Sequence, residues 1–497
     1  MRITQAAEEL SMVTDAQINP PPGVQAGAVE GTSIGLRSVV GFLIFVELVS
    51  GIVQGFYPPL IPHLGSAVHV GGGELNWFSS VQLLAAAVSV PVVAKLGDMY
   101  GHRRLLRIAV AGVALGSLLI ACSRSFPVML AGRALQGPLA AWIALEVAIV
   151  RDKIGGDTAR RSIGLLASAL TAGAVIGALV SGPLDTHLGS LRLTLTVPAV
   201  LTGLCLLVTV CLIPESRSRA TGRIDWAGVT GLATALVLVL LGLSQAAKAG
   251  WGSGRTLGPV AAGLVVLAVW VGWERRASEP LVDMRLFVRR AMWPAQVGAL
   301  LFGVSLFGAQ VPLATFLAAN PHEAGYGFGL SSQSISYVLA LNVLAAVVGA
   351  ALYGGIARLA GMRGVLPLGL LVIVVSYAWL GFLHSDLWMI LVAIPLAGFG
   401  TGLLLGGLPA YVSEVAPANQ VGIASGTYST IKVLGGSVAS AVFGVLLATS
   451  VLSGTKIPAL EGYVVVWFAC AGTALLGVVT FLAGWATKGA RADLSIS

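Results

Sequence analysis

A ten-residue stretch that occurs twice in the chain decides the fold. Its first copy is AKLGDMYGHR at residues 94–103, and its second copy is GGIARLAGMR at residues 354–363. Both copies follow the pattern small-x-x-x-charged-x-x-Gly-x-Arg, and each follows a long apolar block. The triplet LAG also occurs at 130–132 and again at 396–398. These coincidences predict that the chain contains two related halves.

The blocks around these stretches are more apolar than a soluble protein allows. Of the 497 residues, 56% are hydrophobic and 10% are charged, whereas soluble domains carry about 25% charged residues. A bilayer core about 30 Å thick requires about 20 apolar residues per helix, and the blocks have that length rather than the roughly ten-residue alternation of a barrel strand. The sequence therefore predicts an all-α polytopic membrane protein.

We expect fourteen transmembrane helices. They are placed at residues 38–62, 75–95, 106–126, 128–150, 162–183, 193–213, 226–247, 257–273, 292–317, 332–357, 364–383, 387–412, 421–449 and 463–486. The predicted segments are a disordered cytosolic tail (1–37), an N-terminal six-helix half (38–213), a linker with a central extra helix pair (214–291), a C-terminal six-helix half (292–486) and a cytosolic tail (487–497). Six-helix halves built from inverted repeats are typical of secondary transporters.

The distribution of positive charge predicts the orientation. With the N-terminus inside, the cytoplasmic loops and the two tails hold 22 of the 29 Lys and Arg residues. Because positive residues accumulate in cytoplasmic loops, we expect both termini in the cytoplasm and the multi-pass protein in the plasma (cell inner) membrane. The net charge of +8 reflects this bias and contact with the cytoplasmic leaflet. Nucleic acid is not expected as a partner.

The first copy of the repeated stretch resembles a signature of the major facilitator superfamily, G-x-L-x-D-R-x-G-R-R. The residues that match it are Leu96, Asp98, Gly101, Arg103 and Arg104. Span 4 carries RALQG at 133–137, which is similar to the R-x-x-Q-G of that family, and PLVDMRLF at 280–287 is similar to its 14-span drug:proton antiporter branch. The resemblance covers the chain after residue 37 and implies multidrug or metabolite efflux by a monomer.

Span 5 resembles the antiporter signature G-x-x-x-G-P-x-x-G-G of that branch. The sequence keeps Gly173, Gly177 and Gly182, but it has Ala178 in place of the proline and Ser181 in place of the glycine before Gly182. Small residues along one helix allow neighbouring helices to approach closely. We therefore expect these glycines to serve helix packing in a bundle whose halves rock against each other.

The resemblance implies that the loop after span 2 latches the two halves together on the cytoplasmic side. The residues of this cytoplasmic gate are Asp98, Gly101, Arg103 and Arg104. A carboxylate there can accept hydrogen bonds from a helix N-terminus, and the start of span 13 near Asn419 is the expected partner. The alternative is that these charges only mark a cytoplasmic loop.

Four ionisable groups fall within the spans, where charge is costly and points to function. They are Glu47, Arg133, Glu146 and Lys432. Glu47 lies ten residues after Arg37, about 15 Å deep at 1.5 Å per residue. A carboxyl group in an apolar cavity favours its protonated form, so Glu47 is the first candidate for the proton or cation site. The alternative is a static ion pair with Lys432.

The remaining candidates each have a structural alternative. Arg133 matches a position that the family uses in its proton relay, and the alternative is a hydrogen-bond hub to span 1. Glu146 belongs to the same site or pairs with a loop arginine such as Arg151. Five polar side chains either line a substrate cavity or bridge helices, and they are Gln54, Gln82, Gln136, Gln310 and Asn342.

Several function classes are excluded by missing motifs. The sequence has no P-loop pattern, no H-E-x-x-H motif and no appended soluble domain of useful size. ATP-driven pumping by this chain alone is therefore excluded. We expect no enzymatic activity, no cofactor and no metal site.

The leading hypothesis is secondary active transport, in which amphipathic drugs or secondary metabolites are exported in exchange for protons by alternating access. The runner-up is a proton-coupled symporter of a nutrient or organic anion, with Arg133 and Lys432 as anion contacts. A membrane scaffold or sensor is a third hypothesis, and the buried charges argue against it. Substrate charge separates the first two, because a cation requires a free Glu47, whereas an anion requires a free Lys432 or Arg133.

Overall fold

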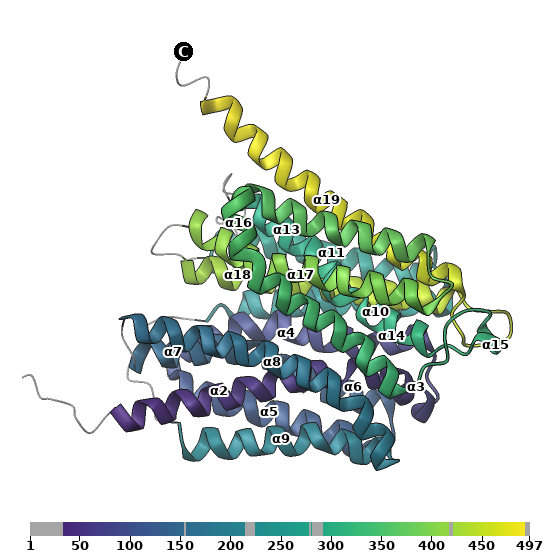
Figure 1. The fold of residues 1–497 in the computed structure, drawn as a ribbon, viewed down its shortest axis with the longest axis horizontal. Helices are drawn as coiled ribbons and strands as arrows, with labels where there is room; N and C mark the ends of the chain where they lie inside the picture. Colours follow the sequence, from purple (N-terminus) through teal and green to yellow (C-terminus); the bar gives the residue numbers. More distant parts are fainter. Residues whose placement is uncertain are drawn as a thin grey trace, which may run out of the picture.

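The computed structural model describes residues 33–153, 156–213, 224–277, 280, 292–416 and 421–492. Fourteen of its helical segments are long and apolar enough to cross a membrane, which confirms the predicted all-helical, 14-span architecture. Across these ranges β-sheet pairing is limited to an isolated bridge between Val451 and Pro458. The first and last described helices begin and end on the same side of the bundle, which we call the terminal end and which lies on the left in Figure 1. The opposite side is called the far end.

Six spans form the N-terminal half. Their elements are α2 (Ser33–Phe56) with the 3-10 turn η1 (Pro58–Leu60) and α3 (Ile61–Val68), α4 (Gly72–Tyr100), α5 (His102–Cys122), α6 (Phe126–Leu135) with the 3-10 turn η2 (Gly137–Ala141) and α7 (Trp142–Lys153), α8 (Gly156–Leu188), and α9 (Leu191–Cys211). The first and fourth spans are interrupted where prolines occur, at Pro58 and at Pro138. A proline has no N–H to donate to the preceding turn, so the α-helix ends or tightens there.

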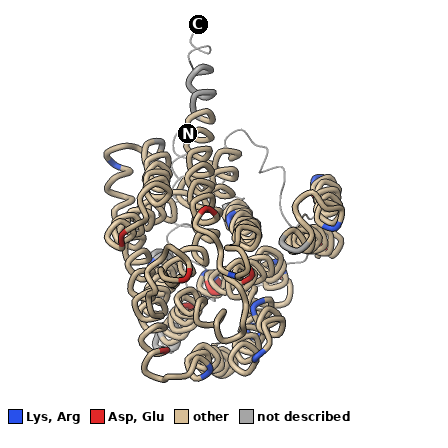
Figure 2. Tube along the Cα trace, turned by 90° about the vertical axis from the view of Figure 1, so that its right-hand side faces the viewer, with Lys and Arg blue, Asp and Glu red and all other residues tan. Residues whose placement is uncertain are grey.

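A helix pair and a second set of six spans follow. The pair is α10 (Trp226–Ala249) and α11 (Gly254–Glu274), and it stands to one side of the main bundle in Figure 2, where most of the trace is uncharged. The elements of the C-terminal half are α13 (Trp293–Gly303), one π-helical turn η3 (Val304–Gly308), α14 (Gln310–Ala318), α15 (Pro321–Ala324), α16 (Ser332–Phe382), α17 (Leu387–Val415), α18 (Val421–Thr449) and α19 (Leu460–Ala492).

Both copies of the repeated stretch form a joint between two spans at their glycine. Gly101 separates α4 from α5 with φ 102° and ψ 128°. Gly361 divides α16 into two spans with φ 70° and ψ 164°. Residues with a Cβ rarely adopt positive φ, whereas glycine does so readily. The glycine of the repeated pattern is therefore explained by a backbone requirement that is present in both halves.

Gly361→Ala is expected to lower stability by roughly 1–3 kcal/mol, the cost of holding a residue with a side chain in this backbone region. Space does not limit the substitution, because no heavy atom lies within 4 Å of the added Cβ. Gly354→Ala is the control, since that position is equally open and lies in regular helix. Thermal unfolding in detergent measures both variants, and equal melting temperatures would contradict the strain argument.

The glycines of span 5 lie at close helix contacts. A Cβ on Gly173 or Gly177 would overlap the backbone of α2 at the carbonyl oxygens of Leu48 and Ile52. A Cβ on Gly182 would overlap the carbonyl oxygen of Ser332 at the start of α16, in the other half. Two of these glycines therefore allow packing within the N-terminal half, and the third allows contact between halves.

The C-terminal half repeats the contact between its first and fifth spans. A Cβ on Gly303 of α13 would overlap the carbonyl oxygen of Lys432 on α18. A Cβ on Gly435 of α18 would overlap the carbonyl oxygen of Leu300 on α13. The same pair of spans thus approaches through glycine in each half.

The two halves contact each other toward the far end, where their ribbons converge in Figure 1. Between α4 and α18, the Ser440 hydroxyl donates to the Asn76 carbonyl and the Ser437 hydroxyl donates to the Ser80 carbonyl, both at 3.3 Å. Between α8 and α16, the Ser336 hydroxyl donates to the Ala178 carbonyl. Small side chains and backbone groups therefore join the halves at this end.

Candidate functional site

Two carboxyl groups lie side by side in the interior of the N-terminal half. Glu47 on α2 is 1% exposed and Glu146 on α7 is 0% exposed. Their side chains are close enough to interact with each other. Within the described part of the chain, Oε2 of Glu47 and both carboxyl oxygens of Glu146 have no hydrogen-bond partner. The structure thus joins two of the ionisable groups singled out from the sequence.

This contact has a chemical requirement. A carboxylate only accepts hydrogen bonds, so two carboxyl groups bond to each other only when at least one carries a proton. Carboxyl groups that share a site in this way hold a proton in common, because two like charges at contact repel strongly. The alternative partners considered from the sequence are not the ones found. Glu47 faces Glu146 rather than Lys432, and Arg151, the loop arginine considered for Glu146, is exposed.

Arg133 is the centre of a second buried network, and it is only 6% exposed. Its Nε donates to the Phe78 carbonyl at 3.0 Å, one terminal nitrogen donates to Oε1 of Gln136 at 2.7 Å, and the other donates to Oε1 of Gln82. The guanidinium carbon also lies 4.8 Å from the centre of the Tyr57 ring. The arginine is therefore well supplied with acceptors by its own half.

Gln136 extends this network to two further helices. Its amide nitrogen donates to the Tyr57 hydroxyl at 3.0 Å and to the Ser117 hydroxyl at 2.8 Å. Tyr57 follows α2, and Ser117 belongs to α5. Arg133, Gln82 and Gln136 thus bridge spans 1 to 4, which corresponds to the hub alternative for Arg133 and to the helix-bridging alternative for the two glutamines.

Lys432, the fourth ionisable group, belongs to the C-terminal half. The residue is half-buried on α18, and its Nζ lies 5.3 Å from the centre of the Tyr428 ring. No hydrogen bond or ion pair joins it to any of the residues that the structure describes. Lys432 therefore differs from Arg133, whose acceptors are all in place.

The residues predicted to form a gate contact their own half. Oδ1 of Asp98 lies 2.9 Å from Nε2 of His102, and Arg103 donates to the Val210 carbonyl at 3.0 Å. Arg104 is exposed. The expected partner Asn419 lies outside the described residues. In this structure Gly101 supplies the joint between α4 and α5, and the charged side chains around it contact α5 and α9.

The other polar side chains predicted from the sequence have local roles. Gln54 donates to the Ser50 hydroxyl at 3.2 Å, and Gln310 donates to the Leu306 carbonyl at 3.2 Å, each within its own span. Asn342 on α16 donates to the Ile394 carbonyl on α17 at 2.9 Å and so bridges two spans. Gln54 is exposed and Gln310 is half-buried, so these two amides remain the more accessible of the set.

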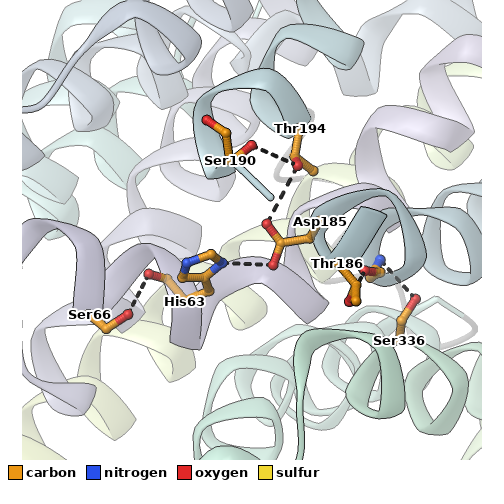
Figure 3. A network of polar contacts seen from close by, with 8 residues as sticks. His63, Ser66, Asp185, Thr186, Ser190, Thr194 and Ser336 are labelled. Carbon is orange, nitrogen blue, oxygen red and sulfur yellow. Dashed lines mark hydrogen bonds and ion pairs between the residues drawn. The ribbon is translucent and has the colours of Figure 1, made fainter. Parts of the chain in front are cut away.

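A polar network at the far end was missed from the sequence (Figure 3). Nδ1 of His63 on α3 lies 2.7 Å from Oδ2 of Asp185 on α8, and Thr194 on α9 donates to Oδ1 of Asp185 at 3.5 Å. On the same turn of α8, the Gly182 N–H donates to the Ser336 hydroxyl on α16 at 3.3 Å. Asp185 lies just beyond the predicted end of span 5, so a span-based search passed over it.

A cavity of about 560 Å³ opens at the far end between the two halves. It is lined by α3 and the start of α4 on one side and by α14 and the segment 456–458 on the other. Its polar lining includes His69, Tyr326, Lys456 and Tyr463.

Two buried polar side chains of the C-terminal half were also missed. Gln296 on α13 is 0% exposed, and neither its amide nitrogen nor its oxygen has a hydrogen-bond partner among the described residues. Tyr428 on α18 is 3% exposed, and its hydroxyl is likewise unpartnered within that part of the chain. An isolated glutamine and an isolated tyrosine in apolar blocks carry no motif, so only their burial reveals them.

Comparison with protein families gives a match over most of the chain. The model for the Major Facilitator Superfamily matches residues 43–440. The Tetracenomycin C resistance and export protein of Streptomyces glaucescens is 30% identical over 402 residues, which cover 78% of this chain and 72% of that protein. The Multidrug resistance protein Stp of Mycobacterium tuberculosis is 28% identical over 409 residues, covering 81% and 74%. The Probable actinorhodin transporter of Streptomyces coelicolor is 27% identical over 450 residues, covering 86% and 73%.

Solved structures share the fold at low sequence identity. The nucleoside transporter NupG has a TM-score of 0.63 at 13% identity and covers 91% of this chain and 99% of that protein. An auto-inhibited peptide transporter of the POT family has a TM-score of 0.65 at 16% identity, with coverage of 90% and 96%. At these identities the likeness concerns the path of the chain alone.

Proposed function

The chain belongs to the Major Facilitator Superfamily, and from that premise we propose that it is a proton-coupled antiporter that exports amphipathic small molecules. The protein is a multi-pass membrane transporter rather than an enzyme. The relatives whose names mention export or drug resistance support the direction of transport. The location that we propose is the plasma membrane, with both termini in the cytoplasm and the protein acting as a monomer.

The carboxyl pair of Glu47 and Glu146 carries this proposal. The pair is buried and its members interact, three of its carboxyl oxygens have no hydrogen-bond partner in the described chain, and a hydrogen bond between the two groups requires a proton. A group that is held this way exchanges protons only when water reaches it. Proton exchange from one side of the membrane at a time is what coupling to a proton gradient requires.

Alternating access of the two halves, 38–213 and 292–486, would open the carboxyl pair to one side of the membrane and then to the other. The contacts between Ser437, Ser440 and α4 at the far end support an inward-facing state of the transporter. In the opposite state these contacts would separate and the pair would be reached from outside. A proton and a substrate then influence each other only through their different affinities for the two states.

Flux measurements in proteoliposomes test the proposal. The probes are ethidium, anthracene-2-carboxamide and anthracene-2-carboxylate, which represent cationic, neutral and anionic amphipathic molecules. We expect at least one of them to move opposite to an imposed proton gradient and to stop when an uncoupler is added. A pH difference of one unit supplies about 1.4 kcal/mol per proton, so each coupled proton supports about tenfold accumulation.

The same measurement separates the alternative function. A symporter of an organic anion would move the carboxylate in the same direction as protons, and this outcome would overturn the proposal of antiport. Flux of all three probes without any response to the gradient would overturn proton coupling. The free ammonium of Lys432 is the observation that keeps the symporter as the second candidate.

A further inference from the structure

Lys432 has no acid partner on any neighbouring helix. The elements packed against α18 include α4, α10, α13, α14, α17 and α19. Their acidic residues are all exposed, and they are Glu74, Asp98, Glu414 and Glu461. Glu47 and Glu146, both buried, belong to the other half and interact with each other, and the other buried carboxyl groups of the described spans, Asp185 and Glu274, lie on α8 and α11. The ammonium therefore lies within a span with nothing among the described residues to balance its charge.

An unbalanced charge in this position is expensive. Lys432 lies eight residues after Ala424, the start of its span, or about 12 Å along the helix at 1.5 Å per residue. A lysine within a transmembrane helix is costly to insert. The contact with the Tyr428 ring offsets only part of that cost. The remaining cost of the unpaired ammonium would be offset by a bound anion.

Unpartnered hydrogen-bonding groups accompany the lysine. The Tyr428 hydroxyl lies one helical turn from Lys432 on α18, and it is buried without a partner in the described chain. Gln296 lies on α13, which approaches α18 so closely at Gly303 that a Cβ would overlap the Lys432 carbonyl oxygen. Buried donors that lack partners cost free energy unless a ligand or water satisfies them. Two such side chains and a half-buried ammonium, on two adjacent helices, indicate a ligand subsite.

Resting on the proposed export function, we propose that the C-terminal half binds an anionic group of the substrate, a carboxylate or an acidic phenolate, at Lys432, with Tyr428 as a second donor. The substrate class is therefore amphipathic organic anions. Arg133 does not compete for this role, because its N–H groups already donate to Phe78, Gln82 and Gln136. A cationic substrate has no comparable carboxylate in this half, because the acidic residues that the structure describes there are all exposed.

This division separates the two bound species. The proton is held in the N-terminal half by carboxyl groups, and the anion is held in the C-terminal half by an ammonium. The two ligands then bind without sharing a group, and their coupling arises from the conformation of the halves.

Equilibrium binding in neutral detergent tests the subsite without relying on transport. The probes are anthracene-2-carboxylate and its uncharged amide, which have the same aromatic body, and their fluorescence is titrated against purified protein. We expect the wild type to bind the carboxylate at least about tenfold more tightly than the amide, as a pairing worth about 1.4 kcal/mol would give. Lys432→Gln should remove this preference, and Lys432→Arg should retain most of it.

The amide serves as the control for folding, because Lys432→Gln should bind it as the wild type does. Tyr428→Phe keeps the aromatic ring and removes only the hydroxyl, so it should weaken carboxylate binding by about threefold if that group is a second donor.

A wild type that binds the carboxylate no better than the amide would overturn the proposal. So would a Lys432→Gln variant that keeps the preference. A carboxylate preference that depends on Lys432, combined with flux that ignores the proton gradient, would uphold the subsite and refute only the antiport function.

Discussion

Replacing Gly173 by valine is expected to prevent the N-terminal half from folding. The added carbons would overlap the carbonyl oxygen of Leu48 and would crowd the backbone nitrogen of Ile52, both on α2. Backbone atoms cannot rotate away as a side chain can, so α2 and α8 would have to separate. Ordinary overpacking costs about 1–3 kcal/mol, and the loss of a whole helix contact should exceed that range.

The same substitution at Gly164 is the matched control. Gly164 belongs to the same helix, is exposed, and has no heavy atom within 4 Å of an added Cβ. Size-exclusion chromatography of detergent extracts should show a monodisperse peak for Gly164→Val and little or none for Gly173→Val. A Gly173→Val protein that elutes and melts as the wild type does would refute the close contact between α2 and α8.

Replacing Glu47 by glutamine is expected to abolish the accumulation of substrate against its gradient while leaving downhill flux. A side-chain amide keeps the size of the group and its hydrogen bonding to Glu146, but it cannot exchange a proton near neutral pH. With a pH difference of one unit the wild type can accumulate substrate about tenfold per coupled proton, whereas the ratio for the variant should approach one. The measurement is the internal concentration of the probe in proteoliposomes at steady state.

Glu461→Gln is the control for this experiment, because it makes the same chemical change at an exposed glutamate at the start of α19. It should accumulate the probe as the wild type does. Glu146→Gln should behave like Glu47→Gln, since each member of the pair depends on the other for its proton. If Glu47→Gln responded to the gradient as strongly as the control, the pair would not be the coupling site.

The arrangement of spans was predictable because a bilayer sets both the length and the composition of a spanning helix. All fourteen predicted spans have counterparts, including the two that prolines divide, such as the span that runs from α6 through η2 to α7. The interruptions themselves were not predicted. They depend on how neighbouring helices satisfy the freed backbone groups, which a window of hydropathy does not contain.

The sequence was enough to predict which residues belong to the candidate site, but it did not predict which of them contact each other. Glu47, Arg133, Glu146 and Lys432 attracted attention because charge within a span is rare. Glu47 and Glu146 are separated by 99 positions in the sequence, and only the packing of α2 against α7 brings them together. The isolation of Lys432 could not be read from the sequence either, because it depends on what the adjacent helices lack.

The two glycine joints, at Gly101 and Gly361, do the same mechanical task in different electrostatic surroundings. Three residues before each glycine stands a charged side chain, but it is Asp98 in one half and Arg358 in the other. The sign of the charge differs between the halves, whereas the positive φ of the joint is the same in both. A single glycine thus turns the chain back into the membrane in each half, and this turn does not depend on the sign of the charge beside it.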